Sequence, residues 1–294
     1  MDWQTRLISV YLTVCNIFDQ QGFSHYLERM SNNKVVLMTD QEVLAIYLFG
    51  MMSHRRTIKQ IHSFASDHFK DWFPNWISYE AFVRRLDQMG EMLPVFLELL
   101  IDTKCHPEMR SRFKLIDSLP IVLAGPKRSN QAKVAPEIAN KGYCATKSLF
   151  YYGVKLHILG SDRDGLLPVP EFIGLTSGSE HDLNAFKLIV PEMQNVEIFC
   201  DKAYCDHETY LELSKLESQL ATPIKLRKGQ KLLDSADRLY SKAVSSIRQP
   251  IESLFGWIQE KTGIQCASKV RSYKGLMVHV FGRLAAAMLM MQPT

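Results

Sequence analysis

The sequence predicts an α/β (α+β) protein in which an all-helical N-terminal domain precedes a mixed sheet with flanking helices. Two observations favour this class. Apolar residues recur at helical spacing over residues 1–110, and from about residue 113 apolar runs of strand length alternate with helical patterns. The change of period predicts two domains, a helical domain at 1–110 and an α/β domain at 111–294.

The composition is that of an ordinary globular protein. Of its 294 residues 46% are hydrophobic and 22% charged, which argues against disorder, and the net charge of +4 permits an anionic partner without requiring one. The six cysteines include no Cys-x-x-Cys pair, so we expect reduced thiols and a cytoplasmic protein. The N-terminus lacks the pattern of a signal peptide, and the apolar segment Leu276 to Met291 is too short to span a membrane.

The N-terminal region contains clear helix starts. Thr39 and Glu42 have the spacing of a capping box, and Ser78 is placed to cap a short helix that carries Arg84 and Arg85. Short helices joined by tight turns could form a helix-turn-helix in which Arg84 and Arg85 contact DNA. A helical bundle with solvated arginines explains the same pattern.

The α/β region has a distinctive order of elements. A strand ending at Asp117 is followed by a polar, basic loop at 125–147, and strands are expected at 150–159 and 166–175, the latter at a sheet edge because of its prolines. A helix then leads to a strand ending at Asp201, and helix, strand and helix follow. This order predicts a mixed sheet of the ribonuclease-H type.

Three acids form the candidate catalytic set. Asp117 and Asp201 each follow an apolar run, and Glu252 lies on a predicted helix whose first turn holds Pro250. Two or three converging carboxylates suit Mg²⁺, with Mn²⁺ as a substitute, and a pair of such ions can cleave a phosphodiester. Asp182 is a rival for the second position, but the apolar lead-in favours Asp201 and the sequence around Asp182 is typical of a helix start.

A basic segment precedes the helix that bears Glu252. Its cations outnumber its acids, which suits a track along a DNA backbone, although a solvated basic loop is the alternative. The DNA-contacting candidates in this segment are Lys225, Arg227, Lys228, Lys231 and Arg248. Arg248 lies one helical turn before Glu252, so it could contact either a phosphate or the glutamate.

The segments around the three acids resemble a known family. Leu115-Ile116-Asp117-Ser118-Leu119-Pro120, Phe199-Cys200-Asp201-Lys202-Ala203-Tyr204 and Arg248-Gln249-Pro250-Ile251-Glu252-Ser253-Leu254-Phe255 are similar to the three blocks of DDE transposases, and most similar to the IS982 family of bacterial insertion sequences. The likeness covers about residues 110–290. Related transposases often carry a Tyr and a Lys near the glutamate, where this chain has Ser245 and Gln259.

This resemblance implies a ribonuclease-H-like catalytic domain in which Asp117, Asp201 and Glu252 bind divalent metal. It implies cleavage at the ends of an insertion element and joining of the 3′-hydroxyl to target DNA. The expected partners are double-stranded DNA, as terminal inverted repeats and target, and further copies of the chain, in a bacterial cytoplasm at the nucleoid. The alternatives are a nuclease of the same fold without strand transfer, a non-catalytic DNA-binding protein, and a metal hydrolase of small phosphoesters.

Overall fold

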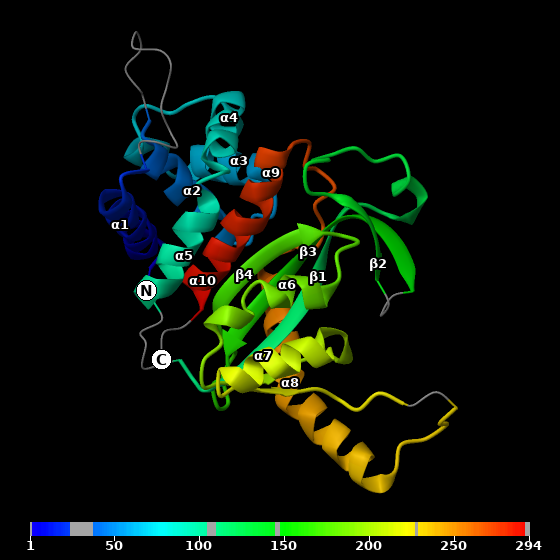
Figure 1. Ribbon diagram of the computed structural model, residues 1–294. Coiled ribbons are helices and arrows are strands. Elements are labelled where there is room, and N and C mark those ends of the chain that lie inside the picture. Colours follow the sequence, from blue (N-terminus) through cyan, green and yellow to red (C-terminus); the bar gives the residue numbers. More distant parts are fainter. Residues whose placement is uncertain (1, 24–37, 105–109, 145–147, 227–228, 292–294) are drawn as a thin grey trace. The chain divides into compact units, whose positions relative to one another are not determined.

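The chain forms two compact units, which are described separately (Figure 1). A computed structural model describes residues 2–23, 38–104, 110–144, 148–226 and 229–291. Unit 1 comprises Met1–Lys104 and Ile258–Thr294, and unit 2 comprises Cys105–Trp257. Residues 258–294 therefore group with the N-terminal helices, whereas the sequence-based division placed all of 111–294 in one domain.

Unit 1 is helical in its described part. Its helices before the sheet are α1 (Trp3–Gln21), α2 (Asp40–Met52), α3 (Ile58–His68), the 3₁₀ turn η2 (Lys70–Trp72), α4 (Tyr79–Met89) and α5 (Leu93–Lys104). The predicted capping box is present, since Thr39 Oγ1 accepts from the Glu42 amide and Glu42 accepts from the Thr39 amide. Ser78 caps α4 as predicted. From Val43 onward α2 is buried along its whole length, which makes it the central helix of this unit.

The C-terminal segment completes the core of unit 1. It consists of α9 (Tyr273–Met277), the π-helical turn η7 (Val278–Gly282) and α10 (Arg283–Met290), and α10 packs against α2 and α5. The hydroxyl of Tyr47 on α2 donates to the Val278 carbonyl, 3.2 Å away. From Leu276 to Met288 this segment is buried. Among the described residues no helix combines the length and apolarity that crossing a bilayer demands.

Unit 2 is built on a mixed, six-stranded sheet. The strands are β1 (Phe113–Ala124), β2 (Asn140–Cys144), β3 (Leu149–Ser161), β4 (Val169–Ser177), β5 (Glu197–Phe199) and β6 (Gln219–Ala221). Their order is β2-β3-β1-β5-β6, with β4 pairing alongside β3. β3 pairs antiparallel with β1, β2 and β4, whereas β5 lies parallel to both β1 and β6.

Helices flank this sheet, which confirms the predicted fold class. Along the chain follow η4 (Pro126–Arg128), α6 (Asp182–Lys187), η5 (Val190–Glu192), η6 (Lys202–Tyr204), α7 (His207–Lys215) and α8 (Ser235–Thr262). Ile116 and Ile198 pack into a core with Phe186 of α6 and Leu213 of α7, so these helices cover one sheet face. Adjacent strand residues point to opposite faces, so Asp117 points to the other face, where it contacts α8.

Three local expectations were wrong. β1 does not end at Asp117 but continues to Ala124, because β3 pairs with it along nearly its full length. Beyond Leu115, β5 no longer pairs with β1, so Pro120 is tolerated on that side of the strand. The segment predicted as a loop contains β2. Pro250 lies inside α8, which begins 15 residues earlier, rather than in a first turn.

Candidate active site

Two of the predicted acids lie just beyond the paired stretch of the parallel strands β1 and β5. The register of β1 and β5 pairs Phe113 with Glu197 and Leu115 with Phe199. Asp117 continues along β1 two residues beyond Leu115, whereas Asp201 lies two residues after Phe199, where β5 has already ended. The negative charge of Asp201 raises the pKa of Asp117, so the two acids lie near one another. The Asp201 carboxylate also accepts from the Lys202 amide at the start of η6, 2.7 Å away.

The third acid joins this pair through an arginine on α8. Arg248 Nη1 donates to Asp117 Oδ2 at 2.9 Å, and Nη2 donates to Glu252 Oε1 at 2.6 Å. Arg248 and Glu252 share a helix face because they are four residues apart. One guanidinium thus bridges an acid of the sheet to an acid of the helix. The sequence predicts that Arg248 contacts either a phosphate or Glu252, and the contact with Glu252 is present. The contact between Arg248 and Asp117 was not predicted.

Asp117 lies in an environment that disfavours its charge. Burial raises the pKa of its carboxyl to about 6, and the negative charges of Glu252 and Asp201 act in the same direction. Arg248 and the Ser118 amide, 2.8 Å from Oδ1, oppose this effect. Three acids face one arginine, so the site carries an excess of negative charge that a cation would neutralise. Glu252, with 53% of its side chain exposed, stays open to solvent.

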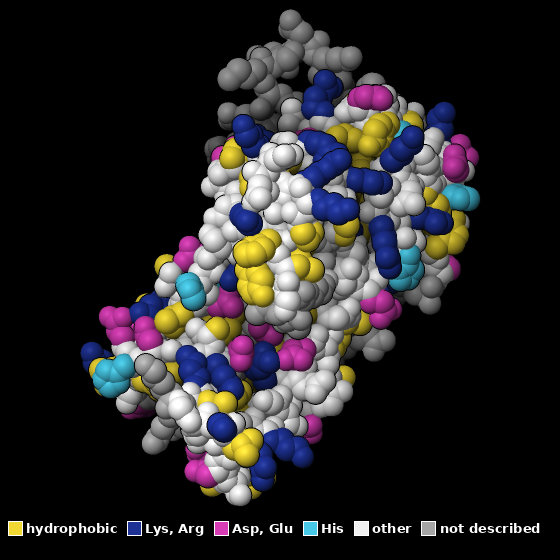
Figure 2. Space-filling view, turned by 90° about the vertical axis from the view of Figure 1, so that its right-hand side faces the viewer, with side chains coloured by type: hydrophobic (Ala, Val, Ile, Leu, Met, Phe, Trp, Pro, Cys, Tyr) yellow, Lys and Arg dark blue, Asp and Glu magenta, His cyan; other side chains and the backbone are white. Residues whose placement is uncertain are grey.

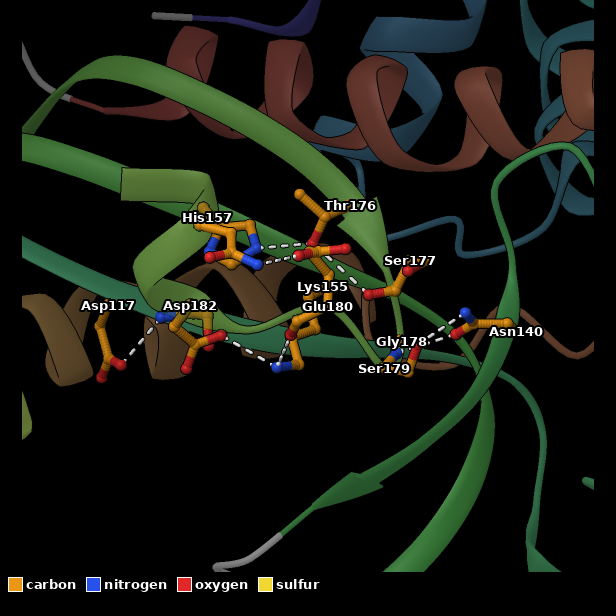
Figure 3. Close-up of polar contacts among 12 residues, drawn as sticks. Asp117, Asn140, Lys155, His157, Thr176, Ser177, Gly178, Ser179, Glu180 and Asp182 are labelled. Atoms are coloured by element: carbon orange, nitrogen blue, oxygen red, sulfur yellow. Dashed lines mark hydrogen bonds and ion pairs between the residues drawn. The ribbon is translucent and has the colours of Figure 1, made fainter. Parts of the chain in front are cut away.

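The rival acid, Asp182, is held elsewhere on the sheet. Lys155 on β3 donates to Asp182 Oδ1 at 3.0 Å and to the Glu180 carbonyl at 2.6 Å, as Figure 3 shows. This geometry favours Asp201 over Asp182 as the partner of Asp117. The same view shows His157, whose Nε2 lies 2.8 Å from Thr176 Oγ1. Burial lowers the pKa of His157 to about 4, so the ring stays neutral.

The predicted DNA-contacting residues fall into three groups. Arg85 is buried and its guanidinium contacts the Asp40 carboxylate and the Met38 carbonyl, so it holds the start of α2 and does not face solvent. This placement contradicts a DNA-contacting role for Arg85. Arg84, Lys225 and Lys231 are exposed, as that role requires, whereas Arg248 is turned toward the acids. Arg227 and Lys228 lie outside the described residues.

Side chains of the metal-binding type are not clustered into a ready-made centre. In the part of the chain that the structure describes, no three His, Cys, Asp or Glu side chains are grouped closely enough to hold a metal ion. Arg248 instead lies between two of the three acids. The donor set still fits a hard divalent cation, because it consists of carboxylate oxygens with uncompensated negative charge. The ion pair between Lys155 and Asp182 was not predicted from the sequence.

Comparison with known proteins identifies the domain that these residues form. No curated protein and no solved structure matches the chain. The family described as "Transposase DDE domain" matches residues 109–289, which is more than half of the chain and includes all three acids. The match also agrees with the helical region, mixed sheet and flanking helices described above. The chain therefore belongs to the DDE transposase family.

Proposed function

We propose that the chain is the transposase of a bacterial insertion sequence of the IS982 type. It cleaves the ends of its element and joins the new 3′-hydroxyl to target DNA, with Asp117, Asp201 and Glu252 as the catalytic acids. Its partners are double-stranded DNA, at the terminal inverted repeats and at the target, and further copies of the chain that bring two ends together. It works in the bacterial cytoplasm at the nucleoid.

The observation that carries this proposal is the link between Asp117 and Glu252 through Arg248, with Asp201 close enough for its charge to act on Asp117. The three acids come from a strand, from the turn after a second strand and from a helix of one unit. A purely structural role for these acids does not explain why Asp117 is largely buried in a site with excess negative charge.

The three carboxylates would hold Mg²⁺, or Mn²⁺ in its place. When bound, the ions supply an activated nucleophile and stabilise charge on the leaving oxygen. Arg248 holds the Asp117 and Glu252 side chains in position and keeps a positive charge beside them. The Ser118 amide fixes one oxygen of Asp117, and the Lys202 amide fixes one oxygen of Asp201. These contacts orient the acids before the DNA arrives.

The test is cleavage of labelled DNA that carries the element's ends, with Mg²⁺ or Mn²⁺, by the wild type and by Glu252→Gln. We expect metal-dependent nicking at the ends by the wild type and none by the variant, with DNA binding preserved in both. Joined products, in which the element's 3′ end is linked to a target duplex, distinguish a transposase from a nuclease without strand transfer. Metal-independent binding without cleavage by either protein would indicate a non-catalytic DNA-binding protein and refute the proposal.

A further inference from the structure

Unit 1 contains a groove of about 780 Å³ that no part of the catalytic site uses. It is bordered by the start of α3, by α4 and by the residues that follow α8. Four cationic side chains line its walls, and these are Arg56, Lys59, Lys269 and Arg271. Asp87 is the one carboxylate among the described residues that line the groove, so its walls carry an excess of positive charge.

The groove also contains a buried positive charge. Arg283 is only 8% exposed, and its guanidinium donates to the carbonyls of Thr262 and Arg56 and to His279 Nδ1. In the described part of the chain no carboxylate forms an ion pair with it. His279 adds no second charge there, because burial and the adjacent Arg283 lower its pKa to about 3 and keep it neutral. A buried guanidinium without a counter-ion attracts an anion to the groove above it.

Two of these wall cations lie at the rim, where they are available to a ligand. Lys59 and Lys269 are exposed, and neither forms an ion pair with any described residue. Lys59 lies in the first turn of α3, where the helix dipole also favours negative charge. Arg271 donates through Nη1 to the carbonyls of Ser268 and Val270, 2.8 Å away in each case, which holds the loop beside Lys269 in shape.

Further cations border the hollows beside this groove. A neighbouring hollow shares Lys59 and Gln60 with the groove and adds Arg55 together with Asp67. Another shares Tyr79 and Asp87 with it and adds Arg84 and Lys274 together with Glu80, so the excess of positive charge is largest in the groove itself. Figure 2 shows Lys and Arg side chains gathered over the helical unit on one face of the molecule. Three connected hollows with cations along them are too extended for a single small anion. They suit a chain of phosphates.

We propose that this groove, formed jointly by the N-terminal helices and the segment after α8, binds the phosphate backbone of double-stranded DNA. The inference rests on the proposed function only in taking DNA as the partner. The sequence suggested a DNA-binding surface within residues 1–110, whereas three of the five Lys and Arg residues in the groove come from positions 269, 271 and 283. Backbone contacts of this kind position DNA without reading its sequence.

The test uses the full-length chain with both rim lysines neutralised, Lys59→Gln together with Lys269→Gln. Its affinity for a labelled double-stranded oligonucleotide is measured across a series of salt concentrations by fluorescence anisotropy. We expect binding roughly 10- to 100-fold weaker at 0.1 M salt, and a slope of log K against log salt that falls by about two, because two phosphate contacts are lost. The loss should be similar for element ends and for unrelated duplexes.

The matched control is Arg6→Gln together with Lys70→Gln, which removes two exposed cations of unit 1 that lie outside the three hollows. It should keep the wild-type slope. If the groove variant binds as tightly and with the same slope as this control, while the wild type still cleaves DNA, the groove inference is wrong and the proposed function stands. If the wild type neither binds nor cleaves DNA, both are wrong.

Discussion

Two arginines, Arg248 in unit 2 and Arg283 in unit 1, have opposite surroundings. Arg248 in unit 2 forms ion pairs with Asp117 and Glu252, and its own charge is outnumbered by the acids around it. Arg283 in unit 1 is held by two carbonyls and a neutral histidine, with further cations on the walls of its groove. The same side chain therefore sits in an acidic excess in one unit and in a basic excess in the other.

The difference indicates how one chain can accommodate both metal ions and DNA. Excess negative charge at the three acids favours divalent cations, and excess positive charge in the groove favours phosphates. Each arginine is also a positioning group, since its hydrogen bonds fix the neighbouring backbone or side chains. The predictions below test whether charge, rather than packing alone, distinguishes the two sites.

The largest effect is expected at the acidic site, from Asp201→Asn. This change keeps the shape of the side chain and its contact with the Lys202 amide but removes a negative charge that acts on Asp117. Cleavage of end-containing DNA should fall by at least about 100-fold, as when other groups that stabilise a transition state electrostatically are removed. DNA affinity should stay within a few-fold of the wild type. Gel analysis of cleavage products and anisotropy of the same duplex measure the two quantities.

The matched control for Asp201 is Asp182→Asn. Asp182 is an acid of the same unit whose carboxylate is engaged by Lys155. Its replacement should reduce cleavage far less than the change at Asp201. A larger loss from Asp182→Asn would make Asp182 the second acid and remove Asp201 from the site.

The next effect is on stability and separates two adjacent arginines of α4. Arg85 is buried against Asp40, so Arg85→Met leaves that carboxylate without its partner and should lower the free energy of unfolding by about 3–5 kcal/mol. Arg84 is exposed, and Arg84→Met should change the free energy of unfolding by less than about 0.5 kcal/mol. Urea unfolding followed by circular dichroism measures both. Equal effects would mean that the Arg85–Asp40 pair is not held in the folded chain.

Much of this arrangement follows from local patterns in the sequence. The caps at Thr39 and Ser78 were predicted because a short side chain that satisfies a helix amide is a local property. The same holds for the apolar runs that lead to Asp117 and Asp201, which form two parallel strands. The assignment of these acids to catalysis stays a prediction.

The remaining features depend on partners far away in the sequence. Ser118 and Pro120 have the local preference of a turn, yet the pairing with β3 extends β1 through them. The buried role of Arg85 depends on Asp40, 45 residues earlier, which its own helical pattern does not reveal. The grouping of residues 258–294 with the N-terminal helices likewise arises from packing of α10 against α2 and α5. Local periodicity carries no information about such contacts.

A third prediction concerns the cost of the charge on Asp117. Its carboxyl has a pKa of about 6 in the folded chain against an ordinary value of 3.8, chiefly because it is buried. Ionisation of Asp117 in the folded chain therefore lowers the free energy of unfolding. This loss of stability is absent below pH 3.8, grows between pH 3.8 and 6, and is complete above pH 6. Without metal, Asp117→Asn should therefore stabilise the protein at pH 7 by up to about 3 kcal/mol.

Unfolding in urea with EDTA at several pH values measures this difference between the wild type and Asp117→Asn. The gap should close as the pH falls through the window from 6 to 3.8. The variant should also lose cleavage, so it trades activity for stability. A gap that is constant with pH would show that packing, and not ionisation, separates the two proteins.

The smallest effect on stability is expected at Tyr47, which lines the basic groove. A change at Tyr47 distinguishes the charge of the groove from its shape as the cause of DNA binding. Tyr47 donates to the Val278 carbonyl in the π-helical turn, and its own hydroxyl is uncharged because burial raises its pKa. Tyr47→Phe should cost about 1 kcal/mol and lower the melting temperature by about 2–4 °C, because the Val278 carbonyl loses its partner. The salt slope of DNA binding should not change, since no cation is removed.

Tyr273→Phe, whose hydroxyl bonds to no described residue, serves as the control and should melt like the wild type. A flatter salt slope for Tyr47→Phe would mean that the shape of the groove, rather than its charge, governs binding there.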